Sequence, residues 1–137
     1  KELKEKNINI SDYARDMLEK TTVSTPEHLD LVRLTVKDLG FPDGATTDEI
    51  YQRAKEFGLE LCPQDTGPNL RLQNSTPDYM FIAMKQITDR YGDPNVFGLD
   101  RDDVDLWLYG YWARPDSRWH GGFRFVFRLR KLDKLET

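Results

Sequence analysis

The stretch FRFVFRLRK at residues 123–131 alternates between apolar and basic side chains along almost its whole length. Because successive side chains of a β-strand point to opposite faces, the apolar residues share one face and the arginines share the other. Leaving large apolar side chains in water costs about 1.5–3 kcal/mol each, so the fold must cover the apolar face. That face holds Phe123, Phe125, Phe127 and Leu129, and the other holds Arg124, Val126, Arg128 and Arg130.

A second strand is predicted over DLWLYGYW at residues 105–112, and it carries aromatic rings on both faces. If the two strands pair as a hairpin, one set of its side chains joins the phenylalanine face. That set is Leu106, Leu108 and Trp112. The remaining rings then lie beside the arginines. The sequence thus predicts an aromatic–arginine surface made of Trp107, Tyr109, Tyr111, Arg124, Arg128 and Arg130.

The first half of the chain carries the start and stop signals of helices. A short helix is expected over residues 11–20, where Ser11 can cap the first turn. A second is expected over residues 26–39, with Thr25 as its cap and Gly40 as its end. A third is expected over residues 46–57, because Thr46 and Glu49 have the spacing of a capping box.

From Leu59 onward the apolar period changes from about 3.6 to 2, which is typical of strands. Strands are expected around Leu59–Leu61, around Leu70–Leu72, over residues 79–87 and over residues 95–99, in addition to the two above. The predicted fold is α+β, with about three N-terminal helices packed on one face of a C-terminal four- to five-stranded, mostly antiparallel sheet. We expect one domain over residues 1–137, with a helical part at about 10–58, a β part at about 59–131, and tails at 1–9 and 132–137.

Composition limits the classes of partner. The net charge of −4 argues against a surface that binds nucleic acid over its whole extent. Acidic residues concentrate between positions 89 and 105 and basic residues between 114 and 134, which indicates either local charge complementarity or a basic surface. No apolar run approaches the ~20 residues of a membrane span. Together with a single cysteine, Cys62, this predicts a soluble cytoplasmic protein without disulfides.

Other candidate sites are weaker. The loop at 113–122 carries His120 as a conceivable general base and Arg114 and Arg118 as an anion clamp, although the preferred interpretation is a solvated connection held by Trp119. Cys62 is predicted to be a small buried apolar residue rather than a nucleophile. No metal site and no cofactor motif is predicted, because one cysteine and two distant histidines lack ligand spacing.

These observations predict a non-catalytic binding or accessory module that uses the aromatic–arginine surface, with a protein or single-stranded nucleic acid as partner. Cation–π contacts could also make the same pairing purely structural. One alternative is a small enzyme acting on an anionic substrate through the 113–122 loop. Another is a structural domain that forms homo-oligomers through the helix at 26–39, which has apolar residues on two sides.

Overall fold

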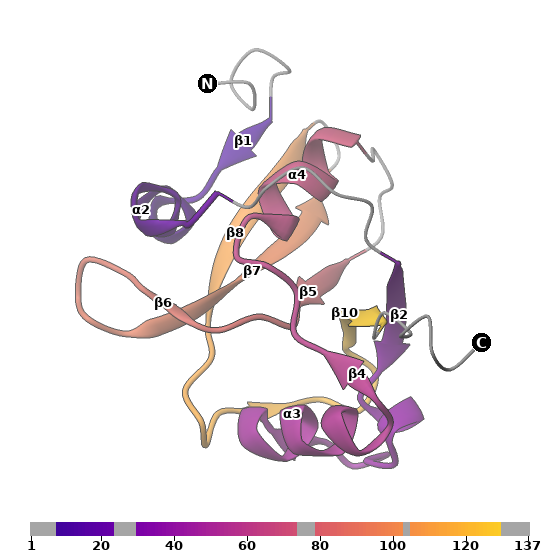
Figure 1. Ribbon diagram of the computed structural model, residues 1–137. Coiled ribbons are helices and arrows are strands. Elements are labelled where there is room, and N and C mark those ends of the chain that lie inside the picture. The colour runs from indigo at the N-terminus through magenta and orange to yellow at the C-terminus, as the bar shows by residue number, and fades with distance from the viewer. Residues whose placement is uncertain (1–7, 24–29, 74–78, 103–104, 130–137) are drawn as a thin grey trace.

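The computed structural model describes residues 8–23, 30–73, 79–102 and 105–129. In these ranges the chain forms three α-helices, and Figure 1 shows them arranged around a large sheet. The helices are α2 (Asp12–Lys20), α3 (Thr47–Glu56) and α4 (Thr66–Gln73), and a 3₁₀ turn, η1, spans Lys37–Leu39. Among the described residues, no helix is both long and apolar enough to span a membrane.

Over the described residues, the main sheet has eight strands and is mixed. Its principal order is β1 (Asn9–Ile10), β8 (Leu106–Trp112), β7 (Pro94–Arg101), β5 (Met80–Ile82), β10 (Arg124–Leu129) and β2 (Leu31–Thr35). In addition, β4 (Leu59–Glu60) pairs with β10 and β6 (Ile87–Thr88) pairs with β7. The β1–β8 and β5–β10 pairs are parallel and the other pairs are antiparallel. A separate two-stranded sheet joins β3 (Ala45–Thr46) to β9 (Arg118–Trp119).

The predicted fold class was therefore wrong. Helices and strands are interspersed along the chain, because β2 and β3 lie in the part expected to be helical and α4 lies in the part expected to be β. The sheet also has more strands than expected and contains parallel pairs. Of the predicted tails, Ile8 is buried and Asn9 begins β1, whereas residues 1–7 and 132–137 lie outside the described ranges.

Two helices were predicted correctly because side chains cap them locally. Ser11 Oγ accepts a hydrogen bond from the Ala14 backbone N–H at the start of α2. At α3, the Thr46 hydroxyl accepts from the Glu49 backbone N–H while the Glu49 carboxylate accepts from the Thr46 N–H, which completes the capping box.

The predicted helix over residues 26–39 does not form where the structure describes it. Residues 31–35 form strand β2, which pairs with β10, and a short 3₁₀ turn follows before Gly40. Residues 24–29 lie outside the described ranges. The strand expected around Leu70–Leu72 was also wrong, because these residues belong to α4. The oligomerisation hypothesis depended on the two-sided helix and loses that basis.

The hairpin between the two aromatic strands was wrong as well, because β7 and β5 lie between β8 and β10. Residues paired across neighbouring strands point to the same face of a sheet. One row of paired residues runs through Phe125, Phe81, Gly98 and Tyr109 on β10, β5, β7 and β8. Trp107, Tyr109 and Tyr111 therefore share the face of the phenylalanines, and the arginines of β10 point to the opposite face.

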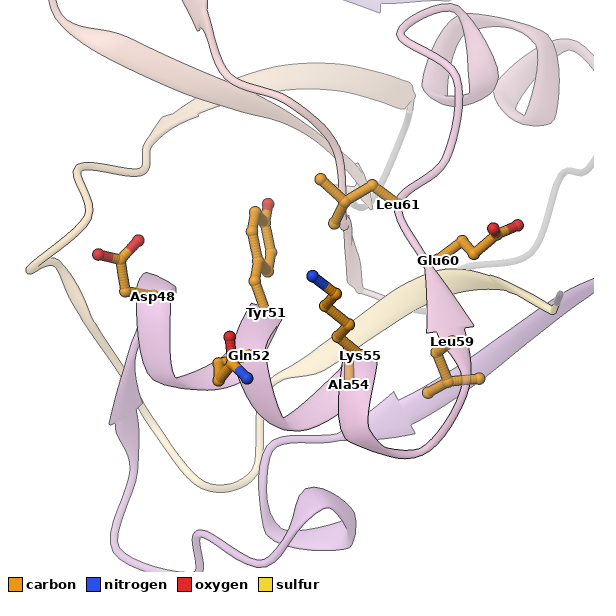
Figure 2. Close-up of a pocket in the computed structure, with 8 residues that line it drawn as sticks. All are labelled: Asp48, Tyr51, Gln52, Ala54, Lys55, Leu59, Glu60 and Leu61. Carbon is orange, nitrogen blue, oxygen red and sulfur yellow. The ribbon is translucent and has the colours of Figure 1, made fainter.

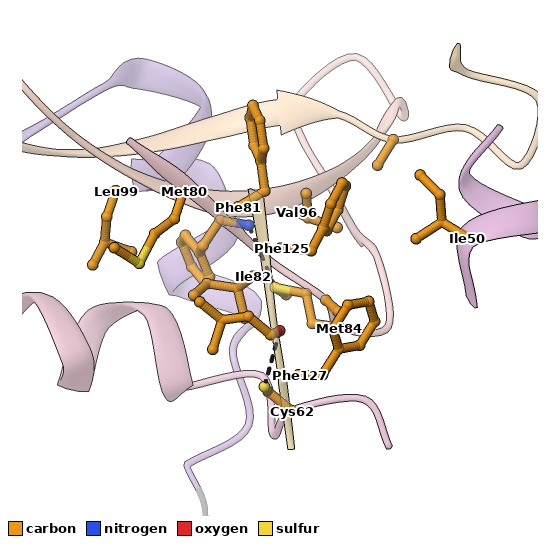
Figure 3. Packing of buried hydrophobic residues seen from close by; sticks show 14 of the residues in the cluster. Ile50, Cys62, Met80, Phe81, Ile82, Met84, Val96, Leu99, Phe125 and Phe127 are labelled. Carbon is orange, nitrogen blue, oxygen red and sulfur yellow. Dashed lines mark hydrogen bonds between the residues drawn. The ribbon is translucent and has the colours of Figure 1, made fainter. Parts of the chain in front are cut away.

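Helices α2 and α4 cover the face opposite to Phe125 (Figure 1). A Cβ at Gly110 on β8 would lie 2.7 Å from Met17 Sδ, so the absence of a side chain there lets α2 approach the strand closely. In α4, Gly67 packs in the same way against Phe97 of β7. Figure 3 shows the buried side chains of β5, β7 and β10 packed together, with Ile50 of α3 at the side.

On the phenylalanine face, the β10 end is covered by the small sheet and α3. The Trp119 ring of β9 lies 5.0 Å from Phe125 and 4.7 Å from Phe81 between centroids. Its Nε1–H donates a 2.8 Å hydrogen bond to the hydroxyl of Thr47, the first residue of α3. The loop from 113 to 122 thus pins a buried tryptophan onto the core.

Candidate functional site

A continuous series of aromatic ring contacts, which we call the aromatic face, runs along the same side of the sheet from Trp119 and Phe123 to the β8 end. Its members are Tyr79, Phe81, Trp107, Tyr109, Tyr111, Trp119 and Phe123. Trp107 and Tyr109 are nearly parallel, at 12° and 5.1 Å between centroids. Tyr111 follows at 5.7 Å from Tyr109 and meets Phe81 edge-on at 4.7 Å. The series therefore connects the surface of β8 to the buried core.

Most rings at this end are half-buried rather than enclosed. Tyr79, Trp107, Tyr109, Tyr111 and Phe123 are all partly accessible. The helices that contact β7 and β8 lie on the opposite face, as Gly110 and Gly67 show. Over the described residues, this end of the sheet thus presents rings to solvent instead of packing them beneath a helix.

The indole of Trp107 is fixed by a hydrogen bond. Its Nε1–H donates to Asp102 Oδ2 at 2.7 Å, and the other oxygen of Asp102 accepts from the Asp105 backbone N–H at 2.6 Å. The carboxylate thereby holds both the ring and the turn that leads into β8. Because the ring is already oriented, a bound partner would lose little side-chain entropy in ordering it.

Tyr111 is held by close packing over a glycine of the neighbouring strand. A Cβ at Gly98 would overlap the Tyr111 ring, so any larger residue there would displace the ring. Burial raises the pKa of Tyr111 well above its usual range, and a hydrogen bond with Tyr79 and the charge of Asp100 act in the same direction. The phenol is therefore neutral at physiological pH.

Carboxylates surround the outer end of the aromatic face. Asp100 pairs with Trp107 across β7 and β8, so the two side chains share a face. Burial, followed by the charges of Asp100 and Asp102, raises the pKa of Tyr109. A negative potential disfavours the phenolate, and the same potential attracts a cation.

A recess of about 560 Å³ opens where the aromatic face meets β9 and α2. Tyr13 of α2 and Trp112 contribute to it besides the members of the aromatic face, and Arg118 adds a positive charge. Tyr13 lies 6.2 Å from Trp112 and 6.4 Å from Tyr91 between ring centroids. Trp112 and Tyr91 are 54% and 70% exposed, so exposed rings continue around the edge of β8.

The structure does not bring the predicted arginines to this surface. Arg124 is exposed on the opposite face, and Arg128 lies 4.0 Å from Glu60 of β4. Arg130 lies outside the described residues. Of the six predicted residues, Trp107, Tyr109 and Tyr111 are brought together, and Arg124 and Arg128 are separated from them.

Sequence reasoning missed Tyr79, Phe81, Asp100 and Asp102 as neighbours of these rings. Tyr79 directly precedes β5, Phe81 and Asp100 belong to β5 and β7, and Asp102 follows β7. The assumed hairpin left no place for these strands beside β8. The one local signal was the acidic run immediately before Trp107, which indicates a negative charge near the ring without revealing the strand beside it.

The loop at 113–122 does not assemble an acid–base pair among the residues described. His120 is exposed, its Nδ1 accepts a hydrogen bond from the Gly122 N–H, and its ring lies 5.7 Å from Phe123. Arg114 forms an ion pair with Asp93. Arg118 lowers the pKa of Glu49, after the larger effect of the Thr46 hydrogen bonds. The three candidates thus serve separate local contacts.

Cys62 is buried, and its Sγ lies 3.4 Å from the Val126 carbonyl oxygen (Figure 3). Burial raises the pKa of its thiol to about 12, so the thiolate needed for nucleophilic attack is scarce at neutral pH. Within the part of the chain that the structure describes, no group of three or more histidine, cysteine or acidic side chains is arranged to hold a metal ion.

A second recess, of about 580 Å³, lies between α3 and β4 (Figure 2). Its rim carries charged and amide side chains from Asp48, Gln52, Lys55 and Glu60. The Tyr51 hydroxyl inside it donates to the Met84 carbonyl and accepts from the Met84 N–H, and burial raises its pKa above the usual range. Tyr51 is therefore a structural link between α3 and the residues after β5.

No protein-family model, no curated protein and no solved structure matches this chain. The geometry of the aromatic face is therefore the basis on which a function can be assigned.

Proposed function

We propose that this chain is a non-catalytic binding module whose aromatic face receives a protein partner. The observation that carries the proposal is the unbroken series of ring contacts from the buried Phe81 to the half-buried Trp107 and Tyr109. Tryptophan and tyrosine are the residues most enriched at interaction hot spots, because they bury a large area at low entropic cost.

A protein is favoured over single-stranded nucleic acid by the charge of this face. Stacking on aromatic rings would suit bases, but nucleic-acid sites combine such rings with basic side chains that follow the phosphates. Here Asp100 and Asp102 lie beside the rings, and the arginines of β10 point to the opposite face. Carboxylates repel phosphates and accept hydrogen bonds from lysine, arginine or backbone N–H groups.

The test is a selection of a displayed random-peptide library on the immobilised protein, followed by affinity measurements on individual peptides. The site variant is Trp107→Ala/Tyr109→Ala, and the matched control is Arg124→Ala on the opposite face. We expect enriched peptides to bind the unmodified protein and the control equally. The site variant should bind them at least about 10-fold more weakly, because loss of a hot-spot ring typically costs about 2 kcal/mol or more.

Thermal melts establish that all three proteins are folded, which separates loss of the surface from loss of the fold. Failure to enrich any peptide, or equal binding by the site variant, contradicts the proposal. A fluorescent single-stranded oligonucleotide is titrated in parallel. Binding of the oligonucleotide that is lost in the site variant and retained in the control would replace the protein partner by nucleic acid.

A further inference from the structure

We infer that the partner binds as an extended segment that adds a strand to β8 at residues 110–112. This stretch, which we call the β8 edge, lies beyond the residues that pair with β1. The inference rests on the proposed function and deepens it, because it names the conformation of the partner and the backbone groups that bind it. Main-chain hydrogen bonding to the edge of a sheet is a recurring mode of peptide recognition.

Strand β1 accompanies β8 over a short distance. It pairs with β8 through Asn9 and Ile10. The chain then leaves the edge at Ser11, whose side chain caps the start of α2. Helix α2 passes over the face of the sheet at Gly110. Within the described ranges, no strand therefore continues beside β8 as far as Trp112.

The backbone of the β8 edge directs hydrogen-bonding groups away from β7. In an antiparallel pair, successive residues alternate between bonding the partner strand and facing away from it. The Leu108 carbonyl accepts from the Ser11 N–H at 3.0 Å, and the Gly110 N–H donates to Ser11 Oγ at 3.2 Å, so residues 108 and 110 face away from β7. Two residues further on, Trp112 faces the same way. The Gly110 carbonyl and the Trp112 N–H and carbonyl thus point outward, as strand addition requires.

Two recesses open beside the β8 edge. One, of about 370 Å³, is lined by Tyr13, Tyr109 and Gly110 among others. The other is the recess of about 560 Å³ at the aromatic face, to which Gly110, Tyr111 and Trp112 contribute. Trp112 itself is 54% exposed. An extended segment therefore finds space along this edge.

The β8 edge lacks the features that usually prevent edge-to-edge pairing. Edge strands are commonly protected by charged residues or by proline. At the opposite edge of the described sheet, β2 has Arg33 at its centre. Residues 109–112 read YGYW and contain neither a charge nor a proline. An edge that is accessible and unprotected suits the backbone of a partner.

Strand geometry also determines where the side chains of the docked segment lie. Residues opposite Gly110 and Trp112 point to the face covered by α2, and the residue between them points to the aromatic face beside Tyr111. That residue enters the 560 Å³ recess, which Trp119 and Phe123 also line. Because the walls are aromatic rings, we expect a large apolar or aromatic side chain at this position.

The test uses the peptide acetyl-Thr-Thr-Thr-Phe-Thr-Thr-Thr-amide, whose phenylalanine can fill the recess and whose threonines favour an extended conformation. Single N-methyl groups on the phenylalanine and on each neighbouring threonine remove one N–H at a time. Binding is followed by two-dimensional ¹⁵N–¹H NMR on the backbone amide of Trp112. The amide of Asp43, an exposed residue remote in sequence, is the reference signal.

We expect the Trp112 amide proton to move downfield saturably, because it gains a hydrogen bond to the peptide. A docked strand uses the N–H groups of every second residue. N-methylation should therefore weaken binding about five-fold or more at alternate positions and leave the positions between them unaffected. Sensitivity at the phenylalanine indicates parallel docking, and sensitivity at its neighbours indicates antiparallel docking.

A pair of variants tests the protein side of the same hydrogen bonds. Trp112→Pro removes the backbone N–H, and the matched control Trp112→Ala removes the same ring and keeps the N–H. Proline is compatible with an edge strand where the N–H faces outward, and thermal melts establish that both variants are folded. The proline variant should bind the peptide about five-fold or more weakly than the alanine variant.

The inference is overturned if the Trp112 amide does not move, if N-methylation has the same effect at every position, or if the two variants bind alike. Should Trp112→Pro fail to fold, the N-methyl series on the unmodified protein decides the question. The peptide selection tests the proposed function separately. Enriched peptides that bind both Trp112 variants equally would leave the binding function standing and remove the β8 edge as the docking site.

Discussion

Two ends of one sheet face have opposite roles although a single row of paired residues joins them. At one end, Phe125 is fully buried beneath Trp119 of the small sheet. At the other end, Tyr109 is half-buried, and the helices that contact its strand lie on the opposite face. Both β8 and β10 place aromatic side chains on this face at every second position, so alternation alone does not determine whether a ring belongs to the core.

The difference comes from the connecting segments. The 113–122 loop and the start of α3 meet over the β10 end, where the Thr47 N–H donates to the Ser117 carbonyl at 2.9 Å and Trp119 hydrogen-bonds Thr47. The turn between β7 and β8 instead uses Asp102 to orient Trp107 at the edge of the face. The segment that folds over the β10 end therefore makes that end part of the core.

The largest expected loss in the free energy of unfolding is at the β10 end. Phe127→Ala removes a side chain with no solvent exposure, and such substitutions cost about 3–5 kcal/mol through lost burial and the cavity left behind. Urea unfolding followed by circular dichroism measures this loss. A cost below that of substitutions at the β8 end would contradict the assignment of the β10 end as core.

The hydrogen bond between Trp119 and Thr47, which holds the small sheet over the β10 end, gives the second-largest expected loss of stability. Trp119→Phe keeps an aromatic ring and leaves the buried Thr47 hydroxyl without its indole donor, which should cost about 1–3 kcal/mol. A double-mutant cycle with Thr47→Val isolates the bond, and its coupling energy should be about 1 kcal/mol. Strict additivity of the two substitutions would show that the bond contributes nothing.

A smaller loss in the free energy of unfolding is expected at the β8 end. Tyr109→Ala removes a half-buried ring and its contact with Trp107, so the free energy of unfolding should fall by about 0.5–1.5 kcal/mol. The same unfolding experiment measures it. If Tyr109→Ala proves as damaging as Phe127→Ala, the two ends are energetically alike and the proposed binding surface is part of the core.

The smallest effect appears only in alkaline solution. The pKa of Tyr111 is raised in the folded protein, so the neutral phenol contributes stability that is complete below the unfolded pKa of about 10 and is lost as the pH rises further. Tyr111→Phe cannot ionise, so its stability should fall less steeply above pH 10. Urea unfolding between about pH 8 and 11, on either side of the unfolded pKa, tests this, with the slope of stability against pH as the readout.

Local signals were sufficient to predict some elements from the sequence. The capped helices α2 and α3 were found because a side chain within three residues satisfies the first backbone N–H groups. The segment after Pro26 was misassigned because apolar residues at 31, 32, 34 and 36 fit a helix as well as a strand. Pairing with β10, which lies far away in the chain, makes this segment a strand, and no local sequence pattern reveals that pairing.

Which side chains lie together at the candidate site was also predicted only in part. Trp107, Tyr109 and Tyr111 were correctly grouped because alternation within one strand is a local property. Their neighbours were wrong because strand order depends on which segments insert between two strands. Once β5 and β7 separate β8 from β10, the arginines of β10 fall on the other face and Asp100 lies beside Trp107.

The position of β10 in the sheet has a consequence for how the protein is made. β10 pairs with β2 along one edge and with β5 and β4 along the other, although it follows all three in the chain. During synthesis, β2 emerges from the ribosome long before its partner exists, and contacts so distant in sequence slow folding. These strand pairs can form only after residue 129 has been translated, so β2, β4 and β5 stay without this shared partner until then.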